Sequence, residues 1–124
     1  MKNVFGEKLK SCCNKPMTGF FRDGFCRTGE SDYGKHTVCA IMDNEFLKFS
    51  KKRGNDLSTP QKKYMFPGLQ NGDKWCLCVL RWKEAYEAGY APKVDLESTN
   101  EKALNYVSIN DLIKHAYKKK NIDL

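Results

Sequence analysis

The chain has 124 residues, of which 40% are hydrophobic and 30% are charged, and its formal net charge at pH 7 is +7. These proportions are typical of a folded globular protein and exclude wholesale disorder, and the length predicts a single domain over residues 1–124. No apolar run approaches the roughly 20 residues of a membrane-spanning helix, so a membrane-embedded protein is excluded too.

The N-terminal residues 1–8 contain no apolar segment of the kind found in secretory signals. This predicts a cytoplasmic protein, and because the cytosol keeps thiols reduced, disulfides are not the first interpretation of the six cysteines. The positive charge would suit a nucleic-acid or acidic partner, but charge is the only support for that alternative. The densest basic run, residues 118–120, is typical of a solvated tail. Partner and oligomeric state are left unassigned.

In the first 53 residues, the sequence predicts a short strand, one long loop, a second strand and a helix. Residues 3–5 could add a short strand, and residues 12–35 are rich in turn-forming residues but also carry aromatic side chains, which predicts a packed loop. The β-branched stretch 36–41 predicts a buried strand. Residues 44–53 predict a helix that Asp43 caps at its N-terminus.

A second packed loop, residues 54–73, precedes the strongest helical pattern, over residues 74–88. Asp73 would cap this helix and Gly89 would end it in the left-handed conformation. Its apolar residues recur at helical spacing and would form one continuous stripe. These residues are Trp75, Cys78, Val79, Trp82 and Tyr86.

The last quarter of the chain predicts smaller elements. The alternating stretch 93–97 predicts a half-exposed strand, residues 101–105 a single helical turn, and residues 106–107 a short strand. Residues 109–117 predict a helix with Ser108 as its N-cap. Together the elements predict an α+β fold, in which a small sheet is covered by about three helices in two layers, with long packed loops.

Six stretches, spread in order over most of the chain, carry a family resemblance: residues 16–24, 36–40, 53–60, 66–69, 72–78 and 81–82. On these stretches the sequence resembles the domain of unknown function 2237 family, a group of small, mostly bacterial proteins. The resemblance implies a stand-alone α/β domain and brings no activity with it. The chain departs from the family pattern near position 12, where Cys12 and Cys13 are adjacent and the pattern has one cysteine.

The cysteines suggest zinc as one interpretation, because zinc prefers four thiolate or imidazole ligands. The candidate ligands are Cys12, Cys26, Cys39, Cys76 and Cys78. No Cys-x-x-Cys pair is present. His36 and Cys39 stand three apart on a predicted strand and would point to opposite faces, while Cys76 and Cys78 would diverge on a predicted helix. Free packed thiols with no cofactor are therefore favoured over zinc.

Thiol chemistry is a second interpretation. Cys76 would lie in the first turn of the predicted helix, where the positive end of the helix favours a thiolate. Cys76 or Cys39 would then be the nucleophile and His36 its base. The competing interpretation is that Cys76 simply packs beside Trp75.

Polar residues on the two long loops suggest a third interpretation, in which Arg22, Asp23, His36, Asn55 and Asp56 lie near a ligand pocket. Each cluster can also be explained by hydrogen bonding within tight turns, which is the favoured local explanation. The leading functional hypothesis is a small cytosolic domain that binds a ligand or partner in a concave site bearing Arg22 and Asp56. A thiol-dependent enzyme and a structural Cys/His metal protein are the alternatives.

Overall fold

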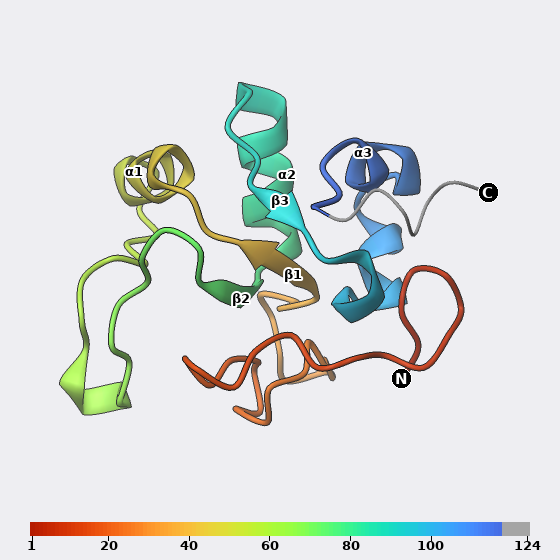
Figure 1. The fold of residues 1–124 in the computed structure, drawn as a ribbon, viewed down its shortest axis with the longest axis horizontal. Helices are drawn as coiled ribbons and strands as arrows, with labels where there is room; N and C mark the ends of the chain where they lie inside the picture. Colours follow the sequence, from red (N-terminus) through yellow and green to blue (C-terminus); the bar gives the residue numbers. More distant parts are fainter. Residues whose placement is uncertain (118–124) are drawn as a thin grey trace.

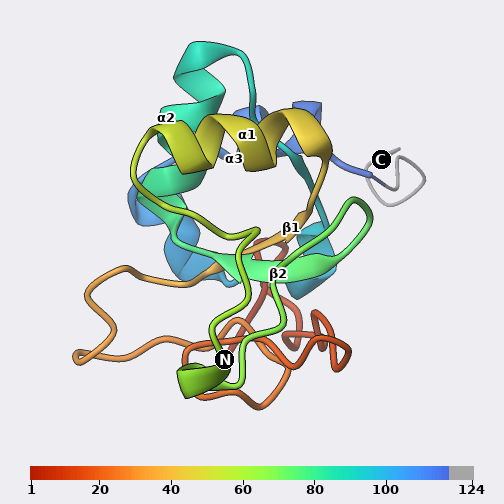
Figure 2. The same ribbon diagram turned by 90° about the vertical axis from the view of Figure 1, so that its left-hand side faces the viewer.

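In the computed structural model, which describes residues 1–117, a small antiparallel sheet lies between a layer of helices and a layer of loops (Figures 1 and 2). The strands are β1 (Val38–Ile41), β2 (Lys74–Leu77) and β3 (Lys93–Val94), in the order β2-β1-β3. The helices are α1 (Asn44–Lys52), α2 (Val79–Ala88) and α3 (Ile109–Lys114). This arrangement confirms the predicted α+β fold.

The main core lies between the sheet and the helices. Trp82 of α2 is fully buried, as are Phe46 of α1 and Val38 and Val94 of the sheet. The Trp82 indole N–H donates to the carbonyl of Pro92 at 3.1 Å, so the one polar group of this side chain is satisfied inside the core.

Helix α1 follows the sequence prediction closely. Asp43 is its N-cap, and the carboxylate accepts a hydrogen bond from the Phe46 N–H at 2.7 Å. Phe46, Leu47 and Ser50 form its buried face. The helix ends at Lys52, one residue before the predicted end.

The predicted helix over residues 74–88 is wrong in its first third. Residues 74–77 form β2, with Cys76 opposite Cys39 of β1, and α2 begins only at Val79, with Cys78 as its N-cap. The reason is that three successive β2 residues are buried, so the strand shows no alternation, and a short apolar run beside a helix then reads as its continuation. The predicted end is confirmed, because Gly89 closes α2 with a φ of 84°.

Regular structure near both ends of the described chain is shorter than predicted. Strand β3 has two residues and is followed by a 3-10 helix, Leu96–Ser98. The predicted turn is a 3-10 helix, Glu101–Asn105, and α3 keeps Ser108 as its N-cap. Residues 3–5 contribute only an isolated bridge, and residues 106–107 form no strand.

The basic run at residues 118–120 lies outside the described residues. Within residues 1–117, no helix combines the length and apolar character needed to cross a bilayer.

Candidate functional site

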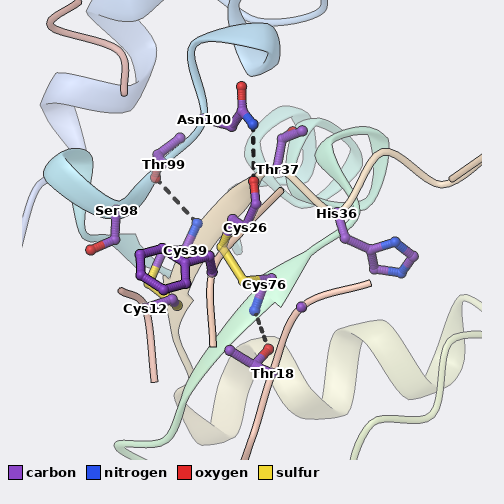
Figure 3. Close-up of a disulfide and its surroundings, with 12 residues drawn as sticks. Cys12, Thr18, Cys26, His36, Thr37, Cys39, Cys76, Ser98, Thr99 and Asn100 are labelled. Carbon is purple, nitrogen blue, oxygen red and sulfur yellow. Dashed lines mark hydrogen bonds between the residues drawn. A yellow bond between two sulfur atoms is a disulfide. The ribbon is translucent and has the colours of Figure 1, made fainter. Parts of the chain in front are cut away.

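Four of the six cysteines form two disulfides, Cys12–Cys39 and Cys26–Cys76 (Figure 3). The expectation of free packed thiols is therefore wrong for these four, and neither Cys39 nor Cys76 is a free nucleophile in this structure. The sequence could not show this because each disulfide joins a cysteine of the long loop to a strand cysteine 27 or 50 residues away, and only the tertiary structure brings the loop onto the paired strands. All four are buried, with at most 5% of any residue exposed.

The disulfides attach the long loop of residues 12–35 to the sheet, and buried hydrogen bonds hold the same junction (Figure 3). The hydroxyl oxygen of Thr18 accepts from the Cys76 N–H at 2.8 Å, and that of Thr99 accepts from the Cys39 N–H at 3.1 Å. The Asn100 amide donates to the Cys26 carbonyl at 3.0 Å. The loop is thus fixed on the sheet face opposite the helices.

A chain of three polar side chains leads from this loop to the start of α2. The Cys78 Sγ lies 3.3 Å from the His36 Nε2, and the His36 Nδ1 lies 2.6 Å from the Asp32 Oδ1. The Cys78 thiol is free and half-buried. A thiol, an imidazole and a carboxylate in this order form a nucleophile, a base and a group that orients the base.

Asp32 is held in place by more than His36. Its side chain is fully buried, and its Oδ2 accepts from the Thr28 hydroxyl at 3.0 Å and from the His36 backbone N–H at 2.9 Å. Burial raises the pKa of the Asp32 carboxyl, but the hydrogen bonds from His36 and Thr28 outweigh burial and leave this pKa below its ordinary value. Asp32 is therefore a carboxylate at neutral pH.

His36 is charged because both of its neighbours in this chain, Cys78 and Asp32, raise the pKa of its ring. Its hydrogen bond with the Cys78 sulfur raises the pKa of His36 to about 9, burial of the ring opposes this rise, and the Asp32 carboxylate supports it. The ring is then an imidazolium at neutral pH, with its two N–H groups directed at the sulfur and at the carboxylate. Its side chain is 31% exposed, so the charged ring keeps contact with solvent.

The backbone around Cys78 fits this pair tightly. A Cβ placed on Gly34 would lie 2.8 Å from the Cys78 Sγ and 3.1 Å from the His36 Cε1. Cys78 is also the N-cap of α2, a helix of ten residues, so its sulfur lies near the positive end of the helix dipole.

The His36 ring opens onto a cavity of about 380 Å³ between the two long loops and β2. The lining residues are Phe20, Arg22, His36, Leu57, Gln61, Tyr64, Phe66 and Trp75. The Phe20 ring stacks on His36 with centroids 6.0 Å apart, and the Arg22 guanidinium lies 5.0 Å from the Trp75 ring centroid. The walls are therefore mostly aromatic, with a cation and the imidazole at the surface.

The five predicted ligand-binding residues are only partly brought together. Arg22 and His36 line the cavity, whereas Asp23, Asn55 and Asp56 are not among its lining residues within the described chain.

Those three residues stabilise turns instead. Asp23 accepts from the Phe25 N–H, and the Asn55 N–H donates to the Ser50 carbonyl. The Asp56 carboxylate accepts hydrogen bonds from Ser58 and Thr59, and these bonds lower the pKa of Asp56.

Sequence reasoning missed Asp32 and misplaced Cys78. Asp32 precedes His36 by four residues in a loop of no regular structure, and such a spacing carries no signal without the loop conformation. Cys78 was predicted inside a helix, whereas its position at the strand-to-helix junction is what aims the thiol at His36.

The match to known families extends over nearly the whole fold, including both loops, the sheet and the site. The pattern of a family described as uncharacterised proteins conserved in bacteria matches residues 2–116. The chain belongs to this family, the domain of unknown function 2237 family. No curated protein matches the chain. The family match therefore assigns no activity to the chain, and a function has to be inferred from the geometry of the site.

Proposed function

We propose that this member of the family is a thiol-dependent enzyme with Cys78 as the nucleophile, His36 as the acid and base, and Asp32 as the residue that orients His36. The observation that carries the proposal is the continuous chain from the Cys78 Sγ to the His36 Nε2 at 3.3 Å and from the His36 Nδ1 to the Asp32 Oδ1 at 2.6 Å. Asp32 keeps one proton on Nδ1, so Nε2 exchanges its proton with the sulfur and the substrate.

The chemistry that suits this arrangement is acyl transfer. The Cys78 thiolate attacks an electrophilic carbonyl carbon and forms an S–C bond, while the His36 Nε2 proton goes to the leaving group as its bond to that carbon breaks. Water then attacks the thioester, His36 takes the water's proton, and the S–C bond breaks to return the thiolate. No oxidant or cofactor is required in these steps.

The aromatic cavity is the proposed substrate site. It adjoins the His36 ring and is walled by both long loops, and aromatic walls bind apolar parts of a ligand by burying them. The binding hypothesis drawn from the loops thus becomes part of the enzyme proposal. Arg22, rather than Asp56, joins His36 as a charged side chain in the lining of this cavity.

Selective alkylation tests the nucleophile. A free thiol with a pKa of about 8.5 is only about 3% thiolate at pH 7. A sulfur held as thiolate by His36 would react faster, but its intrinsic nucleophilicity falls as the thiol becomes more acidic, which limits the gain at pH 7 to about threefold. We expect iodoacetamide at pH 7 to label Cys78 about threefold faster than Cys13, the other free and half-buried cysteine, as measured by peptide mass spectrometry.

His36→Asn provides the control, with circular dichroism confirming that the variant is folded. This change should slow labelling of Cys78 and leave the rate at Cys13 unchanged. If the wild-type protein labels Cys78 no faster than Cys13, or if the variant labels both as the wild type does, the thiol is not activated and the enzyme proposal fails.

We propose the cytoplasm as the compartment, because the proposed enzyme needs Cys78 as a free thiol. Glutathione and thioredoxin systems keep cytosolic thiols reduced. In that compartment Cys12, Cys26, Cys39 and Cys76 would therefore also occur as free thiols.

A further inference from the structure

We propose that the four disulfide-forming cysteines, once reduced, bind one zinc ion, and that zinc then holds the long loop on the sheet in place of the disulfides. This site is separate from Cys78 and does not depend on the enzyme proposal. Cys39 and Cys76 come from adjacent positions on β1 and β2, and Cys12 and Cys26 come from the loop that covers those strands (Figure 3).

The spacing of the sulfur atoms suits a tetrahedral metal. The Sγ atoms of Cys12, Cys26 and Cys39 all lie within 4.8 Å of one another; the Sγ of Cys76 falls outside this group of three but is bonded to Cys26. In a tetrahedral site with Zn–S bonds of about 2.3 Å, the sulfurs are about 3.8 Å apart. A tetrahedral site therefore requires the bonded sulfurs to separate by less than about 2 Å and the Cys76 sulfur to turn toward the Cys12–Cys39 pair, changes that side-chain rotation can supply.

The backbone around the cluster is fixed independently of the sulfur–sulfur bonds. The hydrogen bonds at Cys39, Cys76 and Cys26 use backbone N–H and carbonyl groups, with Thr99, Thr18 and Asn100 as partners. These bonds can persist in the reduced protein, so the four thiols remain converged. A preorganised set of four buried thiols is a closed structural zinc site in its ligand number and type.

The disulfide form becomes the zinc form in two steps, reduction and metal binding. Each disulfide accepts two electrons and two protons from a dithiol reductant, which becomes a disulfide itself, and two thiols form. Zinc(II) then displaces four protons and binds four thiolates.

Cobalt(II) provides a direct probe, because its absorption in a tetrahedral thiolate site differs from that of the hydrated ion. The full chain would be reduced with a phosphine under anaerobic conditions, freed of reductant and titrated with cobalt(II). We expect thiolate-to-cobalt charge-transfer bands that saturate at one ion per chain and are abolished by one equivalent of zinc(II). Elemental analysis after gel filtration should then give one zinc per chain.

Single variants identify the ligands. Cys12→Ser, Cys26→Ser, Cys39→Ser and Cys76→Ser should each weaken binding at least tenfold, whereas Cys13→Ser, a neighbour of Cys12 outside the disulfides, should bind as the wild type does. The wild-type titration decides the matter even if some variants fail to fold. Absence of the charge-transfer bands in the reduced wild type would overturn the proposal, and so would their loss in Cys13→Ser.

Discussion

Replacing Asp32 by Asn tests the role of the carboxylate with almost no change in shape. The Asn side-chain oxygen can still accept from the Thr28 hydroxyl and the His36 backbone N–H, as Asp32 Oδ2 does at 3.0 and 2.9 Å. The amide NH₂ would then face the His36 Nδ1, which becomes an acceptor. When the ring loses one proton in this variant, the remaining proton stays on Nε2, so the neutral ring cannot take a proton from the Cys78 sulfur.

The size of the effect follows from the hydrogen bond that loses its charge. A hydrogen bond to a charged group contributes about 1.5–3 kcal/mol and a neutral one about 1 kcal/mol, so the imidazolium loses about 0.5–2 kcal/mol. Since one pKa unit corresponds to about 1.4 kcal/mol, we expect the pKa of His36 to fall from about 9 by about one unit.

The pH dependence of stability gives a second measurement on the same variant. The raised pKa of His36 means that the folded protein binds the proton more tightly than the unfolded chain does, so its contribution is fully present below pH 6.5 and is lost as pH rises through about 9. The lowered pKa of Asp32 makes its contribution present above pH 3.8 and lost as pH falls below that value. The difference in unfolding free energy between the two proteins should therefore be greatest between these limits.

Proton NMR of the His36 ring and denaturant titrations at several pH values would measure both quantities. An unchanged His36 pKa in the Asn variant would refute the argument that Asp32 holds the imidazolium. A stability difference that grows above pH 7 would have the wrong sign and refute it as well.

Three further substitutions probe the packing around the site. Thr18→Val leaves the buried Cys76 N–H without its acceptor, so the free energy of unfolding should fall by about 1–3 kcal/mol; a loss below about 0.5 kcal/mol in urea titrations would contradict this. Gly34→Ala places a Cβ 2.8 Å from the Cys78 sulfur. Peptide mass spectrometry should then show an altered rate of Cys78 alkylation, while the circular dichroism spectrum stays native. An unchanged rate would argue against the close approach of Gly34 to this sulfur. Trp82→Phe removes an indole donor and leaves a void in a fully buried position, so thermal unfolding should show a loss of about 2 kcal/mol or more, and a wild-type melting temperature would count against the packing described.

Local sequence determined those elements whose start and stop signals lie within a few residues. Asp43 begins α1, Ser108 begins α3 and Gly89 ends α2, because a short side chain that accepts backbone N–H bonds, or a glycine free to take a positive φ, acts on its own neighbours. The α+β class followed from these signals together with the β-branched stretch that became β1.

The tertiary structure decided the rest, because the decisive contacts join residues far apart in the chain. Residues 74–77 form a strand since β1 pairs with them, and this pairing brings Cys39 opposite Cys76 and so builds the sulfur cluster. The contact between Cys78 and His36 spans 42 residues. No periodicity within either segment encodes such a contact, so the site could be predicted from the sequence only as a set of residue types and not as an arrangement.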